Sequence, residues 1–83
     1  MHCIHDWEGI AVYLTGVAPF ADPAFTGIAT KAGRMFEWKA TPNERGYCIE
    51  CVELPTRRYL PTIYETATWA LGLEIFVYIR RNA

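Results

Sequence analysis

The stretch Leu73-Glu74-Ile75-Phe76-Val77-Tyr78-Ile79-Arg80 has the strongest pattern in the chain, because aliphatic residues alternate in it with polar or aromatic ones. Successive side chains of a β-strand point to opposite faces of a sheet, so this alternation predicts a strand over residues 73–80. One face of that strand is aliphatic and suits a core. The other face carries Glu74, Phe76, Tyr78 and Arg80, and we expect it to meet a different surface.

The size and composition of the chain predict one compact domain. Eighty-three residues are enough for one hydrophobic core and too few for two. Apolar residues make up 52% of the chain and charged residues 20%, which is a globular composition and not a disordered one. We therefore take 1–83 as a single domain, with residues 1–8 as a candidate flexible N-terminus.

The net charge and the cysteine content indicate which partners and which cellular compartment to expect. Nine acidic residues nearly balance eight basic ones, so no long-range field draws the protein to nucleic acid or to an anionic membrane. Three cysteines cannot all pair within one chain, which favours a reducing compartment. No secretion signal is readable, and no apolar run approaches the roughly 20 residues that span a bilayer. We expect a soluble, cytoplasmic protein.

The N-terminal half offers one clear strand and one ambiguous segment. Residues 9–17 alternate apolar residues with polar or aromatic ones, which predicts a strand. In the segment 22–32, Asp22 followed by Pro23 is typical of a helix start. We expect a short helix there, and a strand from Thr26 is the alternative.

The C-terminal half begins with a predicted β-hairpin. Residues 34–40 and 46–52 alternate in the same way, and the residues between them have turn chemistry. Further on, Thr62 and Glu65 have the spacing of a capping box, in which each side chain satisfies a free backbone N–H of the other residue at a helix start. A second helix is expected from there to Gly72, followed by the final strand.

The predicted order of elements is β-α-β-β-α-β, the arrangement of ferredoxin-like domains, in which two helices cover one face of a four-stranded antiparallel sheet. The first and last strands are neighbours in that topology. Their rings would then share the uncovered face, and we call this predicted surface the aromatic patch. Its expected protein-binding residues are Tyr13, Glu50, Glu74, Phe76, Tyr78 and Arg80.

The cysteines raise the question of a metal site. Cys48 and Cys51 have the spacing of a zinc-binding pair, and Cys3 and His5 could complete a tetrahedral set. Residues three apart in a strand point to opposite faces, however, so the pair cannot share a metal without breaking the hairpin. We expect ordinary cysteines and no cofactor, with a small zinc-binding module as a lesser alternative.

Candidate acids and bases do not form a recognisable catalytic set. They are His2, His5, Asp6, Glu50 and Glu65. The first three lie near the N-terminus, where catalytic geometry is hard to hold. No triad, phosphate-binding loop or metalloprotease motif is readable. We therefore expect a protein that is not an enzyme.

RNA binding through the aromatic patch is the alternative function, because aromatic residues on an open sheet stack bases in RNA-recognition modules. Two features argue against it. Glu37, Glu50 and Glu74 would line the same face and repel phosphate. The basic pairs Arg57-Arg58 and Arg80-Arg81 would lie at opposite ends of the sheet.

A stretch within residues 34–72 also carries a resemblance to a known family. A Gly-Tyr pair enters a strand, a Leu-Pro pair leaves it, and a threonine followed by Glu and Ala opens the predicted helix. These are Glu44-Arg45-Gly46-Tyr47, Glu53-Leu54-Pro55, Thr62 and Glu65-Thr66-Ala67. The stretch resembles the hairpin-then-helix segment of HicB-type antitoxins, although Thr56 stands where that family usually has glycine. The resemblance implies a partial likeness of fold and the neutralisation of another protein by stoichiometric binding.

Together these observations predict a small non-enzymatic protein-binding module that acts through the aromatic patch. We expect a stoichiometric inhibitor of the kind encoded by a mobile element such as a phage or plasmid. It would be antitoxin-like or directed at a host defence, as anti-CRISPR proteins are. The expected partner is a host or toxin protein, and a second copy of the chain is a further candidate.

Overall fold

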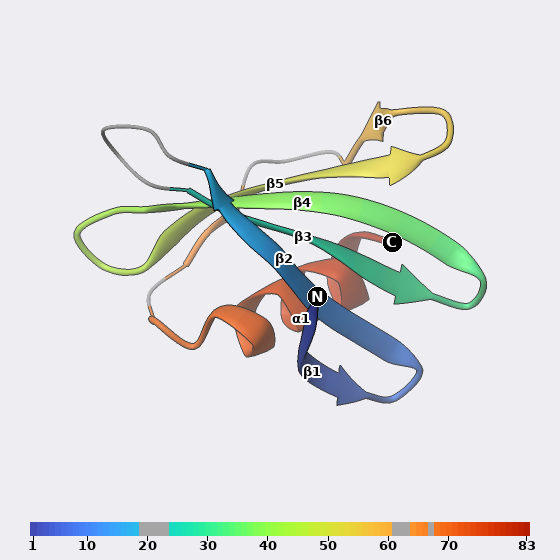
Figure 1. Cartoon of the computed structure of the whole chain (residues 1–83), viewed down its shortest axis with the longest axis horizontal. Coiled ribbons are helices and arrows are strands. Elements are labelled where there is room, and N and C mark those ends of the chain that lie inside the picture. Colours follow the sequence, from blue (N-terminus) through green and yellow to red (C-terminus); the bar gives the residue numbers. More distant parts are fainter. Residues whose placement is uncertain (19–23, 61–63, 67) are drawn as a thin grey trace.

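The computed structural model describes residues 1–18, 24–60, 64–66 and 68–83. They form one antiparallel sheet followed by one C-terminal helix (Figure 1). The strands are β1 (His2–Trp7), β2 (Ile10–Ala18), β3 (Ala24–Lys31), β4 (Arg34–Pro42), β5 (Tyr47–Leu54), β6 (Arg58–Tyr59) and β7 (Tyr64–Glu65), and the helix is α1 (Leu71–Asn82).

The predicted ferredoxin-like fold is wrong. Strands β1 to β6 are hydrogen-bonded in sequential order, as a meander, and β7 pairs with β5 beside β6. A meander brings consecutive strands together through short turns, so no helix has to cross between them. The single described helix follows the sheet instead of alternating with its strands.

Residues 73–80 form most of α1, so the predicted final strand is wrong. The buried residues of this helix are Glu74, Ile75, Phe76, Tyr78 and Ile79. Several of them are three or four positions apart, which places them on one helical stripe. A short run in which most residues are apolar fits a strand period and a helix period equally well.

The expected short helix within residues 22–32 is wrong over its described part, because residues 24–31 form strand β3. The strand alternative from Thr26 is confirmed, because β3 covers that region, whereas Asp22 and Pro23 lie outside the described residues. The predicted helix from Thr62 to Gly72 is wrong. Thr62 also lies outside the described residues, but Glu65 belongs to β7, and α1 begins only at Leu71. Glu65, which the likeness to HicB-type antitoxins places in a helix, therefore lies in a strand.

The strand over 9–17 and the hairpin over 34–52 are confirmed as β2 and as β4 with β5. Two further hairpins have tight turns. The pairs Glu8-Gly9 and Ala32-Gly33 all have positive φ, between 50° and 78°. Two consecutive residues with φ > 0 match the twist of the strands that they join. The first turn folds β1, within the segment 1–8, onto β2 as an edge strand.

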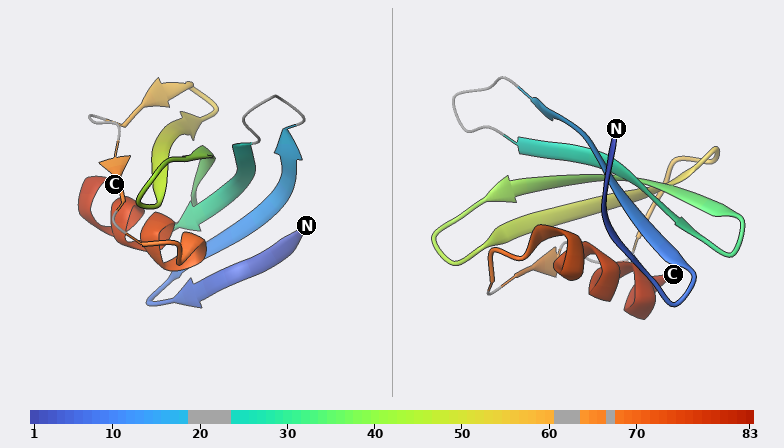
Figure 2. Two further views of the ribbon diagram at one scale, coloured as in Figure 1. Left: turned by 90° about the vertical axis from the view of Figure 1, so that its left-hand side faces the viewer. Right: turned by 60° about the horizontal axis from the view of Figure 1, so that its bottom comes forward.

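Helix α1 covers one face of the sheet, which we call the inner face; the other is the open face (Figure 2). The helix lies so close to β1 that an added Cβ at Gly72 would be 2.6 Å from the Ile4 carbonyl oxygen. The core between sheet and helix consists mainly of buried aliphatic and aromatic side chains. Its largest fully buried members are Trp38, Tyr78, Phe36, Phe76, Ile49, Ile75, Ile79, Val12 and Cys51. Among the described residues, no helix is long and apolar enough to cross a membrane.

Two buried ionisable side chains in this core, a thiol and a phenol, predict that the protein becomes less stable at alkaline pH. Burial raises the pKa of the Cys51 thiol from 9.0 to about 12. Burial, with the nearby Cys51 and Glu50, raises the pKa of the Tyr78 phenol from 10.0 to about 12. Both groups therefore stay neutral in the folded protein at pH values where the unfolded chain ionises. The free energy of unfolding is expected to fall as the pH rises from 9 towards 12.

Urea denaturation curves measured from neutral pH to pH 11 test this expectation. The Tyr78→Phe variant cannot ionise at this position and should lose stability less steeply above pH 10 than the parent. A free energy of unfolding that stays flat across this range in the parent protein would contradict the buried placement of the two groups.

Candidate functional site

The aromatic patch predicted from the sequence does not form. Phe76 and Tyr78 lie on α1 and are each only 1% exposed, packed against the inner face. Tyr13 is on the open face, as expected, with the sheet between it and the other two rings. The prediction depended on residues 73–80 being a strand next to β2. In the helix, Phe76 and Tyr78 belong to the apolar stripe, and this stripe packs against the apolar inner face of the sheet.

The charged residues predicted for the patch are also separated. Glu74 is buried on the inner side of α1. Arg80 is exposed and forms an ion pair with Glu8, with Nη1 and Oε2 3.3 Å apart, at the seam between β1 and α1. Its guanidinium lies 6.0 Å from the centre of the Phe76 ring. Glu50 is the one of these three charged residues that lies on the open face with Tyr13.

The four candidate metal ligands lie in different environments. Cys51 is buried in the core, whereas Cys48 is on the opposite face of β5. The imidazole of His5 packs against the Phe76 ring, with 4.7 Å between ring centres. Cys3 is exposed on β1. Within the described part of the chain, no group of three or more His, Cys, Asp or Glu residues could hold a metal ion.

The open face is hollowed into a trough of about 570 Å³, built from strands β2 to β6. Thr15 and Thr26 line its β2–β3 side, and their hydroxyls donate hydrogen bonds to the backbone carbonyl oxygens of Thr26 and Gly16. The other side chains that line it on the open face combine apolar surface with charge. They are Ile28, Glu37, Lys39, Glu50, Val52 and Tyr59.

A line of directly opposed residues runs across the strands through this trough, and we call it the cross-strand row. Its register pairs are Tyr13–Ile28, Ile28–Glu37, Glu37–Val52 and Val52–Tyr59. Side chains at directly opposed positions are close enough to touch. The row therefore has a tyrosine at each end, a β-branched aliphatic residue inside each tyrosine, and a single carboxylate at its centre.

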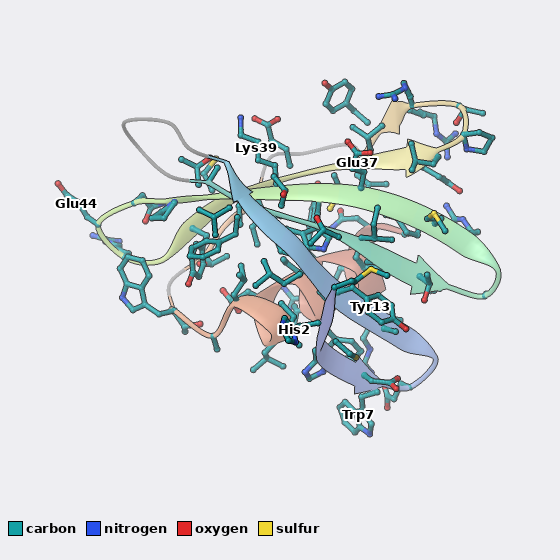
Figure 3. The ribbon with its side chains drawn as sticks, viewed as in Figure 1. His2, Trp7, Tyr13, Glu37, Lys39 and Glu44 are labelled. Atoms are coloured by element: carbon teal, nitrogen blue, oxygen red, sulfur yellow. The ribbon has the colours of Figure 1, made fainter. Side chains whose placement is uncertain are left out.

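The charges in the trough are arranged unevenly. Lys39 is directly opposite Glu50, so these opposite charges are cross-strand neighbours. Glu37, by contrast, has the aliphatic residues Ile28 and Val52 on its two sides. Figure 3 shows Glu37 and Lys39 on the side of the sheet away from α1. Among the residues that the structure describes, no ion pair within 4 Å involves Glu37, Lys39 or Glu50.

Sequence reasoning found part of this site. The alternation in residues 34–40 and 46–52 already places Glu37, Lys39 and Glu50 on one face, with Val52. That reasoning missed Ile28, because β3 was predicted as a helix, and Tyr59, because no strand was predicted over its segment. Had residues 24–31 been predicted as a strand, the short turn at Ala32-Gly33 would have indicated that this strand pairs with β4.

The trough combines apolar surface with a small number of polar and charged groups. Its side chains offer apolar surface, hydroxyls, two carboxylates and one ammonium group, without histidine or cysteine among the described residues that line it. Tyrosine beside aliphatic residues is typical of interface cores. No family model, no curated protein and no solved structure matches this chain.

Proposed function

We propose that this chain is a small non-enzymatic protein-binding module whose trough receives a segment of another protein. The observation that supports the proposal is the open face, which no described helix covers. A hollow of about 570 Å³ on this face is crossed by the cross-strand row, whose tyrosine and aliphatic side chains flank the central Glu37. Tyr59, at one end of that row, is 69% exposed. Contiguous apolar surface on a soluble protein marks an interaction site, and tyrosine is enriched in the cores of such sites.

A protein is a better partner for this surface than a nucleic acid. Two carboxylates, from Glu37 and Glu50, accompany one ammonium group, from Lys39, in the trough. Nucleic-acid affinity comes largely from neutralising phosphates with basic side chains. A surface with net negative charge repels the phosphate backbone, so stacking of bases on the tyrosines would not be supported electrostatically.

The class that we propose is a stoichiometric inhibitor, encoded by a mobile element such as a phage or plasmid and acting in the cytoplasm. The support is the small size of the chain, its three cysteines and the sequence likeness of the hairpin β4–β5 to that of HicB-type antitoxins. An inhibitor of this kind acts by occupying a surface of its target, so it needs an interface and no catalytic set. Capture of the partner from the source cells distinguishes a toxin from a component of a defence complex.

Replacing two apolar residues of the trough, Val52 and Tyr59, should strongly weaken partner binding without unfolding the protein. The double variant Val52→Thr/Tyr59→Ala keeps a β-branched residue in β5 and changes an exposed ring in the short strand β6. Loss of these two apolar contacts is expected to weaken binding by about tenfold or more. Tagged parent and variant proteins are used to capture partners from the source cells, and bound proteins are quantified by mass spectrometry.

The matched control is Leu73→Ala, which removes an exposed apolar side chain from α1, outside the trough. A partner held near one-to-one by the parent and by Leu73→Ala, and lost from the double variant, supports the proposal. If the double variant retains that partner as well as the parent does, the trough is not the binding surface. Thermal unfolding of all three proteins verifies that they are folded.

A further inference from the structure

The carboxylate of Glu37 differs in its neighbours from three other carboxylates on or beside the sheet. Glu53 accepts two hydrogen bonds of 2.8 Å from Arg34, and Glu8 forms an ion pair with Arg80. Glu50 has Lys39 directly opposite. Glu37 instead has an aliphatic neighbour on each side and is exposed to solvent above them.

This position has a consequence for any ligand that covers the trough. A ligand seated on the cross-strand row removes water from Glu37, and an ionised carboxylate that loses water without gaining a partner is strongly unfavourable. Among the described residues that line the trough, the one cation is Lys39, which lies two residues from Glu37 on β4 and directly opposite Glu50, so a single ammonium group serves two carboxylates. The ligand must therefore bring a positive charge to the centre of the row, or binding is weakened.

The surroundings of Glu37 also suit the rest of a basic side chain. Arginine and lysine have aliphatic stems that lie well on apolar surface while the charged end reaches a carboxylate. Ile28 and Val52 supply that surface on the two sides of Glu37. Tyr59, the next residue along the row, presents an exposed ring, and cations are attracted to the faces of aromatic rings.

The shape of the site argues for a protruding ligand and against a second copy of the same surface. The open face is concave, with a hollow of about 570 Å³. Two concave surfaces placed face to face cannot fill each other, and well-packed interfaces need complementary shapes. A single side chain that projects from a strand or loop of a partner fits such a hollow.

We infer that the trough recognises a protein partner through one arginine or lysine side chain, whose charged end pairs with Glu37 between Ile28 and Val52. This inference rests on the proposed function of the trough as a protein-binding site, and it specifies the chemistry of the segment that enters it. The interaction is charge-assisted, so its loss is expected to weaken binding of a basic segment by about tenfold or more.

The test uses the full chain, labelled with ¹⁵N, and a set of blocked peptides as the probe. The peptide acetyl-Val-Thr-Arg-Thr-Val-amide is titrated beside three versions that carry lysine, citrulline or glutamate at the centre. The arginine and lysine peptides should cause saturable shifts of the backbone amides of Ile28, Glu37 and Val52. The citrulline peptide keeps the shape of arginine without its charge, so it should bind about tenfold more weakly. The glutamate peptide should not bind.

Two protein variants isolate the role of the central carboxylate. Glu37→Gln should remove the preference for arginine over citrulline. Glu44→Gln is the matched control, because it makes the same change of charge in the exposed β4–β5 loop, at the far end of the hairpin from Glu37 (Figure 3). It should retain that preference.

Several results would overturn the inference. They are equal binding of the arginine, citrulline and glutamate peptides, shifts located outside the trough, a preference for arginine that persists in Glu37→Gln, or no arginine-dependent shift at all. Shifts at the trough that depend on protein concentration without any peptide would indicate self-association, and would also overturn it.

Binding of the partner captured from the source cells distinguishes this inference from the proposed function. If it is lost from Val52→Thr/Tyr59→Ala but binds Glu37→Gln with full affinity, the protein-binding function stands and the basic-ligand inference fails.

Discussion

Replacing Phe76 and Tyr78 together with alanine is expected to unfold the domain. Both side chains are 1% exposed and pack between α1 and the inner face of the sheet. Truncation of a buried large aromatic residue to alanine costs about 3–5 kcal/mol. A domain of this length has a total stability of roughly 4–12 kcal/mol, so two such losses remove most or all of it. Circular dichroism should show no cooperative thermal transition in the double variant.

A control on the same helix distinguishes this effect from a general sensitivity of α1. Leu73→Ala removes a side chain that is 46% exposed and keeps a good helix former, so the free energy of unfolding should change by less than about 1 kcal/mol. A double variant of Phe76 and Tyr78 that melts cooperatively near the parental temperature would show that the two rings are not in the core. The strand prediction for 73–80 implied that outcome, because it placed both rings on the surface.

Substitution of Gly27 by valine should have the second largest effect. Gly27 is directly opposite Trp38, and the indole of Trp38 lies across the position where a side chain of residue 27 would be. An added Cβ would overlap this ring and the backbone carbonyl oxygen of Tyr13. Neither can move easily, since Tyr13 is held in β2 and Trp38 is 1% exposed. We expect a loss of about 3 kcal/mol or more from overpacking.

Gly16→Ala provides the matched control for Gly27→Val. The nearest atom to an added Cβ at Gly16 is Oγ1 of Thr26, at 3.9 Å, which is ordinary van der Waals contact. Alanine also loses less backbone freedom on folding than glycine, so this variant should be as stable as the parent or slightly more stable. Urea denaturation gives both free energies. Equal stabilities of the Gly16 and Gly27 variants would contradict the close packing of Trp38 on β3.

The sequence by itself determined the elements whose pattern is local. The strand over 9–17 and the hairpin over 34–52 were predicted correctly because period-two alternation and turn residues act between near neighbours. The same alternation placed Glu37, Lys39 and Glu50 on one face of the hairpin, so the charged part of the trough follows from the amino-acid sequence alone.

The conformation of residues 73–80 was decided by tertiary structure. Their alternation is real, but a segment that is apolar at most positions can present an apolar face as a strand or as a helix. Strands β1 to β6 pair with one another as a meander, which leaves the inner face apolar and uncovered. A helix can cover that face with Ile75, Phe76 and Ile79 at once. The free energy gained by burying this face outweighs the weak local preference for a strand.

The trough was likewise completed only by the fold. Ile28 and Tyr59 reach Glu37 and Val52 because β3 pairs with β4 and β6 pairs with β5. These two contacts form only when separate strands pair, and the alternation within one strand does not specify which strand lies beside it. Local periodicity therefore determined which side chains share a face of a strand, whereas strand pairing and helix docking determined which faces became the core and which became the open surface.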